Sequence, residues 1–247
     1  MTRELESHRI AARLFGIFFI LAFLSYGVGS GIVAMVADSP EGLAGYVDHG
    51  TMLIAGVLLM AVVHSFVNIG LSVLAFPVLN SVNGFLAHGY FAAGIAATVT
   101  AVVGALFLAL LVPLGEAFVS AGTGEDYFDT LALLLKKGGF YGYQVSMTLW
   151  GIGGLMLCYV LYVSRLVPRP LAVWGLLGYV IFMVGTTAEM FGYGIGVMLA
   201  IPGGLFELGL SLWLIVKGFD ASVVFARRDE AAAVLRQNQT TRPRPAT

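Results

Sequence analysis

The sequence has little charge. Only 11% of its 247 residues are Asp, Glu, Lys or Arg, whereas 59% are apolar and the mean hydropathy is +0.91. A soluble domain of this length needs more charged side chains to cover its surface. The composition therefore excludes an ordinary soluble protein and indicates that lipid surrounds most of the chain.

Residues for cysteine, metal and hydrolytic chemistry are also scarce. Cys158 is the only cysteine, which excludes an internal disulfide, a cysteine-pair redox site and a cysteine-rich zinc site. His64 has no second histidine at its depth, so a bis-histidine haem is excluded. The chain has no His-Glu-x-x-His motif and no nucleophile elbow, and no basic face with interleaved aromatics for nucleic acid. We expect no cofactor, no metal and no nucleic-acid partner.

Six apolar runs are long enough to cross a hydrocarbon core of about 30 Å, which takes about 20 helical residues. They cover residues 14–36, 51–76, 85–111, 140–163, 171–188 and 194–216. The first run is longer than the apolar region of a signal peptide, about 7–15 residues, and no small-x-small cleavage site follows it. The predicted fold is an all-α bundle of six transmembrane helices, in one domain over residues 14–218.

The basic residues predict the orientation of these helices. If the N-terminus is cytoplasmic, all but two of the 13 Lys and Arg residues fall on the inner side, and only Lys136 and Lys137 face outward. Such an asymmetry favours a cytoplasmic N-terminus and a cytoplasmic C-terminus.

The segments that flank the spans have their own character. Residues 1–13 are expected to form a short cytoplasmic or interfacial helix that runs into the first span. The outer stretch 113–139 is expected to be an interfacial cover with its own helix over 127–137, because it is too short for a core of its own. The tail, residues 219–247, is expected to be cytoplasmic and partly disordered, since its end is rich in Pro and Arg.

Glu207 is the most informative polar residue. It lies at mid-depth in the last run, where inserting a carboxyl costs on the order of 3 kcal/mol or more. Pro202, Gly203 and Gly204 precede it and predict a break in the helix. Interrupted helices beside an intramembrane charge are typical of transporter binding sites. A Pro-kinked helix with a protonated, hydrogen-bonded Glu207 is the equally weighted alternative.

His64, Asn68 and Ser72 form a polar stripe with a spacing of four residues along the second run. The stripe is expected to face the bundle, because lipid would leave these groups without partners. It either makes hydrogen bonds between helices or lines a ligand site together with Glu207. A rise of about 1.5 Å per residue puts His64 and Glu207 at a similar depth, so we expect their side chains to approach each other.

A second polar group gathers toward the outer ends of the later runs. Its members are Tyr141, Gln144, Thr148, Thr186, Thr187, Glu189 and Tyr193. They are expected to line an outward vestibule, in which Gln144 is a candidate ligand contact. Interfacial anchoring is the alternative and is preferred for Tyr193.

Glycines four residues apart occur at several places in the runs. The pairs are Gly27 with Gly31, Gly138 with Gly142, and Gly192 with Gly196. This spacing lets helix backbones approach closely, so it predicts packing within the bundle, with dimerisation as the minor alternative.

Short motifs along the chain occur in an order that resembles a known family. They are Arg9-Ile10-Ala11, Trp150-Gly151, Tyr159, Tyr162-Val163-Ser164, Pro168-Arg169, Pro202-Gly203, Glu207-Leu208, Leu212-Trp213-Leu214 and Lys217-Gly218. In this order they resemble the bacterial multi-pass membrane family known as domain of unknown function 4386. The resemblance implies a helical bundle in a bacterial inner membrane and implies no activity. Relatives often carry a histidine where Gly139 stands and a glycine where Cys158 stands.

Three functions stay open on the sequence. The leading hypothesis is the binding or transport of a small amphiphilic molecule, with Glu207, His64, Asn68 and Gln144 at a polar site near the membrane midplane. Its rival is a non-catalytic accessory or structural subunit, whose glycine-rich faces dock a membrane protein partner or a second copy. An intramembrane enzyme ranks last. A midplane cavity would favour a binding protein, and a fully packed interior would favour a subunit.

Overall fold

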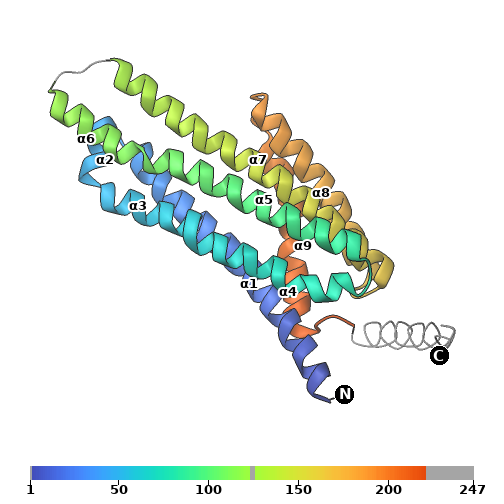
Figure 1. Ribbon diagram of the computed structural model, residues 1–247. Helices are drawn as coiled ribbons and strands as arrows, with labels where there is room; N and C mark the ends of the chain where they lie inside the picture. Colours follow the sequence, from blue (N-terminus) through green and yellow to red (C-terminus); the bar gives the residue numbers. More distant parts are fainter. Residues whose placement is uncertain (1, 123–125, 221–247) are drawn as a thin grey trace, which may run out of the picture.

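The computed structural model describes residues 2–122 and 126–220, and the side chains from residue 9 onward within them. These ranges contain helices and no strand. The first span is α1 (Thr2–Ala37). The second is one continuous helix made of three parts, α3 (Gly50–Leu58), the π-helix η1 (Leu59–Val63) and α4 (His64–Asn80). The other four are α5 (Gly84–Ala109), α7 (Asp126–Ser164), α8 (Arg169–Met190) and α9 (Gly196–Val216). Two short helices, α2 (Gly42–Asp48) and α6 (Leu111–Ala121), pack on each other at one end of the bundle (Figure 1). The predicted all-α bundle of six membrane-crossing helices is confirmed.

The six spans form a closed ring in chain order. α1 packs on α4, α4 on α5, α5 on α7, α7 on α8, α8 on α9, and α9 returns to α1. Consecutive spans run antiparallel because the connections between them alternate between the two ends of the bundle. The ring encloses an interior to which every span contributes side chains.

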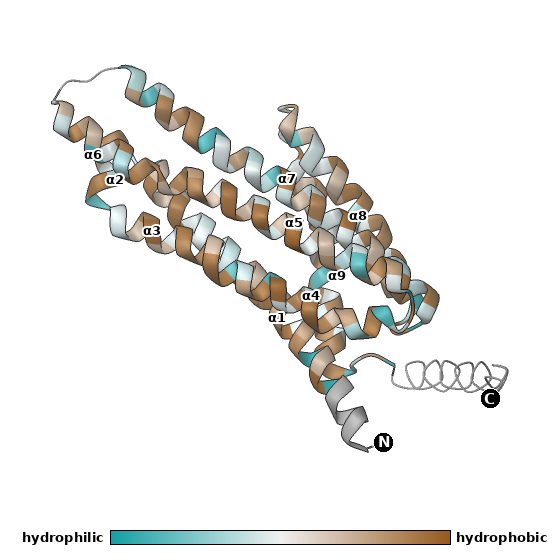
Figure 2. Cartoon of the chain, in the orientation of Figure 1, coloured by the Kyte–Doolittle hydropathy of each residue, from teal (hydrophilic) through white to brown (hydrophobic). Residues whose placement is uncertain are grey.

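Buried apolar side chains form two clusters in this interior. The larger cluster lies toward the start of α1 and includes Phe15, Phe19, Leu71, Leu157 and Phe206. The smaller cluster lies toward α2 and α6 and includes Val33, Leu53, Met60, Ala105 and Leu111. Figure 2 shows hydrophobic residues along the lengths of the long helices, as expected for surfaces in contact with lipid tails. The fold is that of a multi-pass membrane protein.

Close backbone contact joins α5 to α7. A Cβ added to Gly142 would lie 2.6 Å from the Cα of Gly104. Apolar surface gains nothing by leaving lipid, so van der Waals contact of this kind holds such helices together. Gly142 therefore packs within the bundle as predicted, whereas Gly27 and Gly31 have open space where a side chain would be.

Two predicted surface helices are parts of longer helices. Residues 2–13 are the first turns of α1, which continues for 36 residues without interruption. The segment 127–137 begins α7, a single helix of 39 residues. The helix continues through Gly138 and Gly139 because these glycines pack closely on Phe107 and Leu108 of α5. Of the predicted tail 219–247, residues 221–247 lie outside the described part of the chain.

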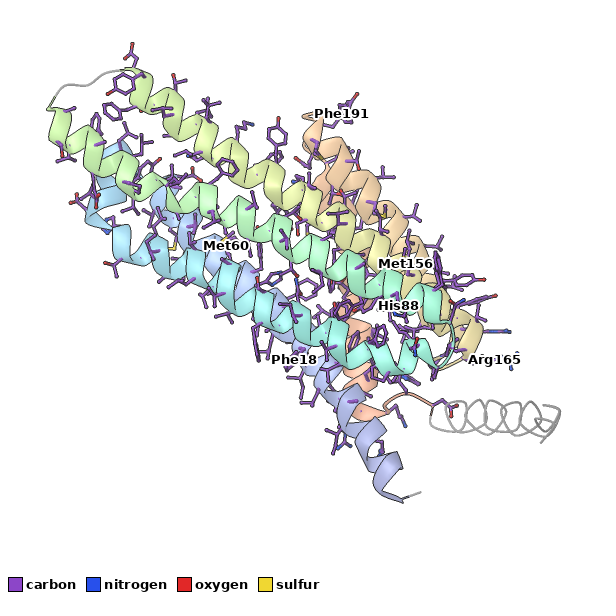
Figure 3. The ribbon with its side chains drawn as sticks, viewed as in Figure 1. Phe18, Met60, His88, Met156, Arg165 and Phe191 are labelled. Carbon is purple, nitrogen blue, oxygen red and sulfur yellow. The ribbon has the colours of Figure 1, made fainter. Side chains whose placement is uncertain are left out.

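The helices differ greatly in length. A rise of about 1.5 Å per residue makes α7 about 58 Å long and α8 about 33 Å long. Consequently α7, together with α5 and α6, extends well beyond the hairpin of α8 and α9 (Figure 1). Figure 3 shows Phe191 at the tip of this hairpin and Arg165 at the opposite end of the bundle.

Candidate functional site

Glu207 lies near the middle of α9, and only 8% of its surface is exposed. Its Oε1 accepts two hydrogen bonds, one from Nε1 of Trp150 on α7 at 2.9 Å and one from the hydroxyl of Tyr179 on α8 at 2.6 Å. Within the described residues, Oε2 has no hydrogen-bond partner, and it is not sealed from the cavity that Glu207 lines. This second oxygen is therefore a polar atom of the lining that makes no hydrogen bond within the described residues.

His64 begins α4, directly after the π-helix η1. A π turn changes the direction of the side chains that follow it and often occurs at functional sites. Here it aims the imidazole at α1, where Nδ1 lies 3.1 Å from the Ala22 carbonyl oxygen and 3.4 Å from the Ser25 hydroxyl. Nε2 lies 2.9 Å from Nδ2 of Asn68.

These contacts define the hydrogen-bonding roles of the ring. The Ala22 carbonyl can only accept, so Nδ1 of His64 carries a proton and donates it. Nε2 then accepts from the Asn68 amide, and both nitrogens are used. Among the residues that the structure describes, no hydrogen bond joins His64 to Glu207, because each already has other partners. Both side chains nevertheless line one cavity.

This cavity lies inside the ring and has a volume of about 660 Å³. Ligand pockets typically measure about 300–1,000 Å³. All six spans contribute to its lining, and most of the lining is apolar. Its polar side chains are Tyr26, Ser30, Asp38, His64, Asn68, Lys136, Tyr143, Trp150, Tyr179 and Glu207. The cavity is long: Lys136 lies about 21 Å from Trp150 along α7 at 1.5 Å per residue.

An ion pair lines the end of the cavity that lies toward α2 and α6. Nζ of Lys136 lies 2.6 Å from Oδ1 of Asp38 and also donates to the Ala37 carbonyl at 3.0 Å. A cation near the last carbonyls of a helix is favourable, because those groups carry negative partial charge. Lys136 therefore links α7 to the end of α1.

The predicted helix break before Glu207 is not there. α9 runs from Gly196 to Val216 through Pro202, Gly203 and Gly204. Pro202 cannot donate to a carbonyl of the preceding turn, but contact with α8 holds the helix, since a Cβ on Gly178 would lie 3.1 Å from the Cα of Gly203. Gly203 and Gly204 line the cavity, so their lack of side chains enlarges it.

The residues of the predicted outer vestibule make separate contacts at different places. Gln144 is buried but does not line the cavity. The hydroxyls of Thr148 and Thr186 lie 2.9 Å apart and join α7 to α8. Oε1 of Glu189 accepts a 2.6 Å hydrogen bond from the backbone N–H of Gly196 and so caps α9. The two threonines and Glu189 therefore make contacts between or at the ends of helices, and Gln144, the one predicted ligand contact among these residues, lies outside the cavity lining.

Four aromatic residues of the site were not among the predicted site residues. Trp150 and Tyr179 bind the carboxyl of Glu207, and the rings of Tyr26 and Tyr143 stack 5.0 Å apart beside His64. Tyr and Trp in spans are usually assigned to the membrane interface. Their position in the sequence could have identified them. Trp150 and Tyr179 lie near the middles of the predicted runs 140–163 and 171–188, at the depth of Glu207 and away from the membrane interface.

The arrangement is suited to binding. In the described ranges no three His, Cys, Asp or Glu side chains gather where they could hold a metal ion.

Neither a curated protein nor a solved structure matches the chain. The family described as Domain of unknown function (DUF4386) matches residues 14–218, which include every helix from α2 to α9 and most of α1. The chain therefore belongs to this family, whose description assigns no function.

Proposed function

We propose that this protein binds a small amphiphilic molecule inside its helix ring. The apolar part of the molecule lies along the cavity between α1 and α7, and its polar head reaches Glu207. The observation that carries the proposal is the carboxyl itself: two helices donate hydrogen bonds to Oε1 and leave Oε2 open at the deep end of a cavity of about 660 Å³.

The cost of this arrangement supports a functional role. A carboxyl inside a membrane is unfavourable by on the order of 3 kcal/mol or more, and a protein that needs only a packed interior has no use for one. An accessory subunit whose polar groups only hold helices together has no need of a cavity of ligand size either. The binding hypothesis therefore takes precedence over the subunit hypothesis.

The proposed location is a bacterial inner membrane with both termini in the cytoplasm. Arg9, Arg13, Arg165, Arg169 and Lys217 lie at the end of the bundle where α1 begins, and Lys136 lies toward the other end. Basic residues concentrate on the cytoplasmic side of membrane proteins, and the motifs of the chain resemble those of bacterial membrane proteins.

The test is mass spectrometry of the small molecules that co-purify with the full chain in mild detergent. Gly27 lines the cavity and has nothing within 4 Å of the position of an added Cβ. The variant Gly27→Leu should therefore fill the cavity without a clash and lose the bound molecule. Gly31 lies one turn further along α1, is equally open and lies outside the lining, so Gly31→Leu is the matched control and should keep it.

Two results would contradict the proposal. The first is that the wild-type protein carries only bulk phospholipid. The second is that Gly27→Leu and Gly31→Leu retain the same amount of the same molecule, because the molecule would then lie outside the cavity.

A further inference from the structure

The charges that line the cavity do not balance. Among the described residues, its only cationic side chain is Lys136, which is already paired with Asp38 at the end toward α2 and α6. Glu207 at the deep end is bonded only to the neutral donors Trp150 and Tyr179. His64 uses both ring nitrogens for other contacts, Nδ1 toward the Ala22 carbonyl and Nε2 toward Asn68, so the ring does not pair with Glu207 in the described residues. Within the described lining, Glu207 is therefore an acidic group that no cationic side chain contacts.

Aromatic rings surround the same end of the cavity. Phe19, Tyr26, Tyr143, Trp150, Tyr179 and Phe182 all belong to the lining. Phe19 packs on Trp150 at 5.9 Å between ring centres, and Tyr26 stacks on Tyr143 at 5.0 Å. The faces of aromatic rings carry negative partial charge and attract cations, most strongly where water is excluded.

We infer that the polar head of the ligand is an organic cation, an amine or a quaternary ammonium group. This inference rests on the proposed function and names its substrate class. The cation pairs with Oε2 of Glu207 and lies among the rings, and its apolar tail follows the cavity toward Lys136. Both charges would be unfavourable alone at this depth, and pairing them removes that penalty.

Other head groups fit the site less well. An anionic head, such as a carboxylate or phosphate, would approach Glu207 without meeting an unpaired Lys or Arg among the described lining residues. A neutral hydroxyl or amide can hydrogen-bond to Oε2 but gains nothing from the rings. The lining therefore selects by the sign of the charge.

The experiment compares three probes that share a dodecyl tail. Their heads are trimethylammonium, its uncharged tert-butyl analogue, and carboxylate. The protein is the full chain in a maltoside detergent with Trp174→Phe and Trp213→Phe, which leaves Trp150 in the cavity as the only tryptophan and its fluorescence as the readout. We expect the trimethylammonium probe to bind at least about tenfold more tightly than the uncharged probe, and the carboxylate probe to bind most weakly.

A pair of variants assigns the preference to one carboxyl. Glu207→Gln should lose the preference for trimethylammonium, so that the trimethylammonium and uncharged probes bind this variant with similar affinities. Glu189→Gln is the matched control, because Glu189 caps α9 outside the cavity, and it should keep the preference. The three-probe comparison on the unaltered site remains valid if Glu207→Gln fails to fold.

The possible failures are distinct. Similar affinities for all three heads would overturn the cation assignment and leave the proposed function intact. Tighter binding of the carboxylate probe would overturn the assignment in the same way. No binding of any probe would overturn the proposed function and the inference together.

Discussion

The hydroxyl of Tyr179 on α8 donates a 2.6 Å hydrogen bond to Oε1 of Glu207 on α9, near the middle of both helices. Trp150 of α7 donates to the same oxygen from the next helix in the ring. One carboxyl oxygen thus joins three consecutive spans and fixes the direction of the other oxygen. The stability of the bundle and the proposed ligand binding therefore depend on the same residue.

The first prediction concerns this three-helix junction. Glu207→Leu removes the acceptor of two buried donors and should lower the free energy of unfolding by about 1–3 kcal/mol for each donor left unpaired. Glu207→Gln keeps a carbonyl oxygen in place and should be much milder. A double-mutant cycle with Tyr179→Phe should give a coupling energy of about 0.6–1.7 kcal/mol, the range for hydrogen bonds between transmembrane helices. Thermal or denaturant unfolding in detergent measures each value, and a coupling energy of zero would show that the bond contributes nothing.

The second prediction concerns His64 and Glu207. Because the two side chains have separate partners, the losses of stability in His64→Leu and Glu207→Leu should add to within about 0.5 kcal/mol in the double variant. The control is the pair His64→Leu and Asn68→Leu, whose effects should not add, since Nε2 of His64 accepts from Asn68. A large coupling energy between His64 and Glu207 would mean that the two residues act as one unit.

The third prediction concerns the crossing of α5 and α7. An added methyl group on Gly142 meets the Cα of Gly104 at 2.6 Å, and backbone atoms cannot turn aside as a side chain can. Gly142→Ala should therefore destabilise the protein by about 1–3 kcal/mol through overpacking. Gly31→Ala, at an open position, should be neutral or stabilising, because Ala favours helix over Gly by about 1 kcal/mol. Equal effects in unfolding experiments would show that α5 and α7 are further apart than described.

The fourth prediction concerns orientation. Cys158 is fully buried, so the native chain should resist labelling by a membrane-impermeant thiol reagent. Ser120→Cys near the end of α6 should be labelled from outside intact cells, and Ser81→Cys, in the connection between α4 and α5, only after lysis. The reverse pattern would invert the proposed topology.

Hydropathy was sufficient to predict the six spans, because the length of an apolar run depends only on membrane thickness and helical rise. It could not predict how far α7 extends. Lys136, Lys137, Gly138 and Gly139 have the composition of a boundary, and only the packing of both glycines on α5 keeps the helix intact there. Local sequence does not contain that contact.

The candidate site was predictable in part. Glu207 and His64 were identified because a polar side chain in the middle of a span is unfavourable unless it has a partner or faces a cavity. Both line the cavity. Their partners were assigned wrongly, since depth along a helix does not tell which way a side chain turns around it. Trp150 and Tyr179 lie at the same depth as Glu207 and carry the donors that a buried carboxyl requires. A search for donors at matching depth would have found them.

The unequal helix lengths have a consequence for the surrounding bilayer. The hairpin of α8 and α9 matches a hydrocarbon core of about 30 Å, whereas α7 is nearly twice that length and exposes Leu131, Leu133 and Leu134 far beyond the level where the hairpin ends. The first turns of α7 thus carry apolar side chains between the charged pairs Asp126 with Asp129 and Lys136 with Lys137, beyond the level that the hairpin reaches. The bilayer can accommodate this difference in length by becoming thicker around the long helices, or the long helices can tilt. The protein should therefore prefer bilayers of a particular thickness.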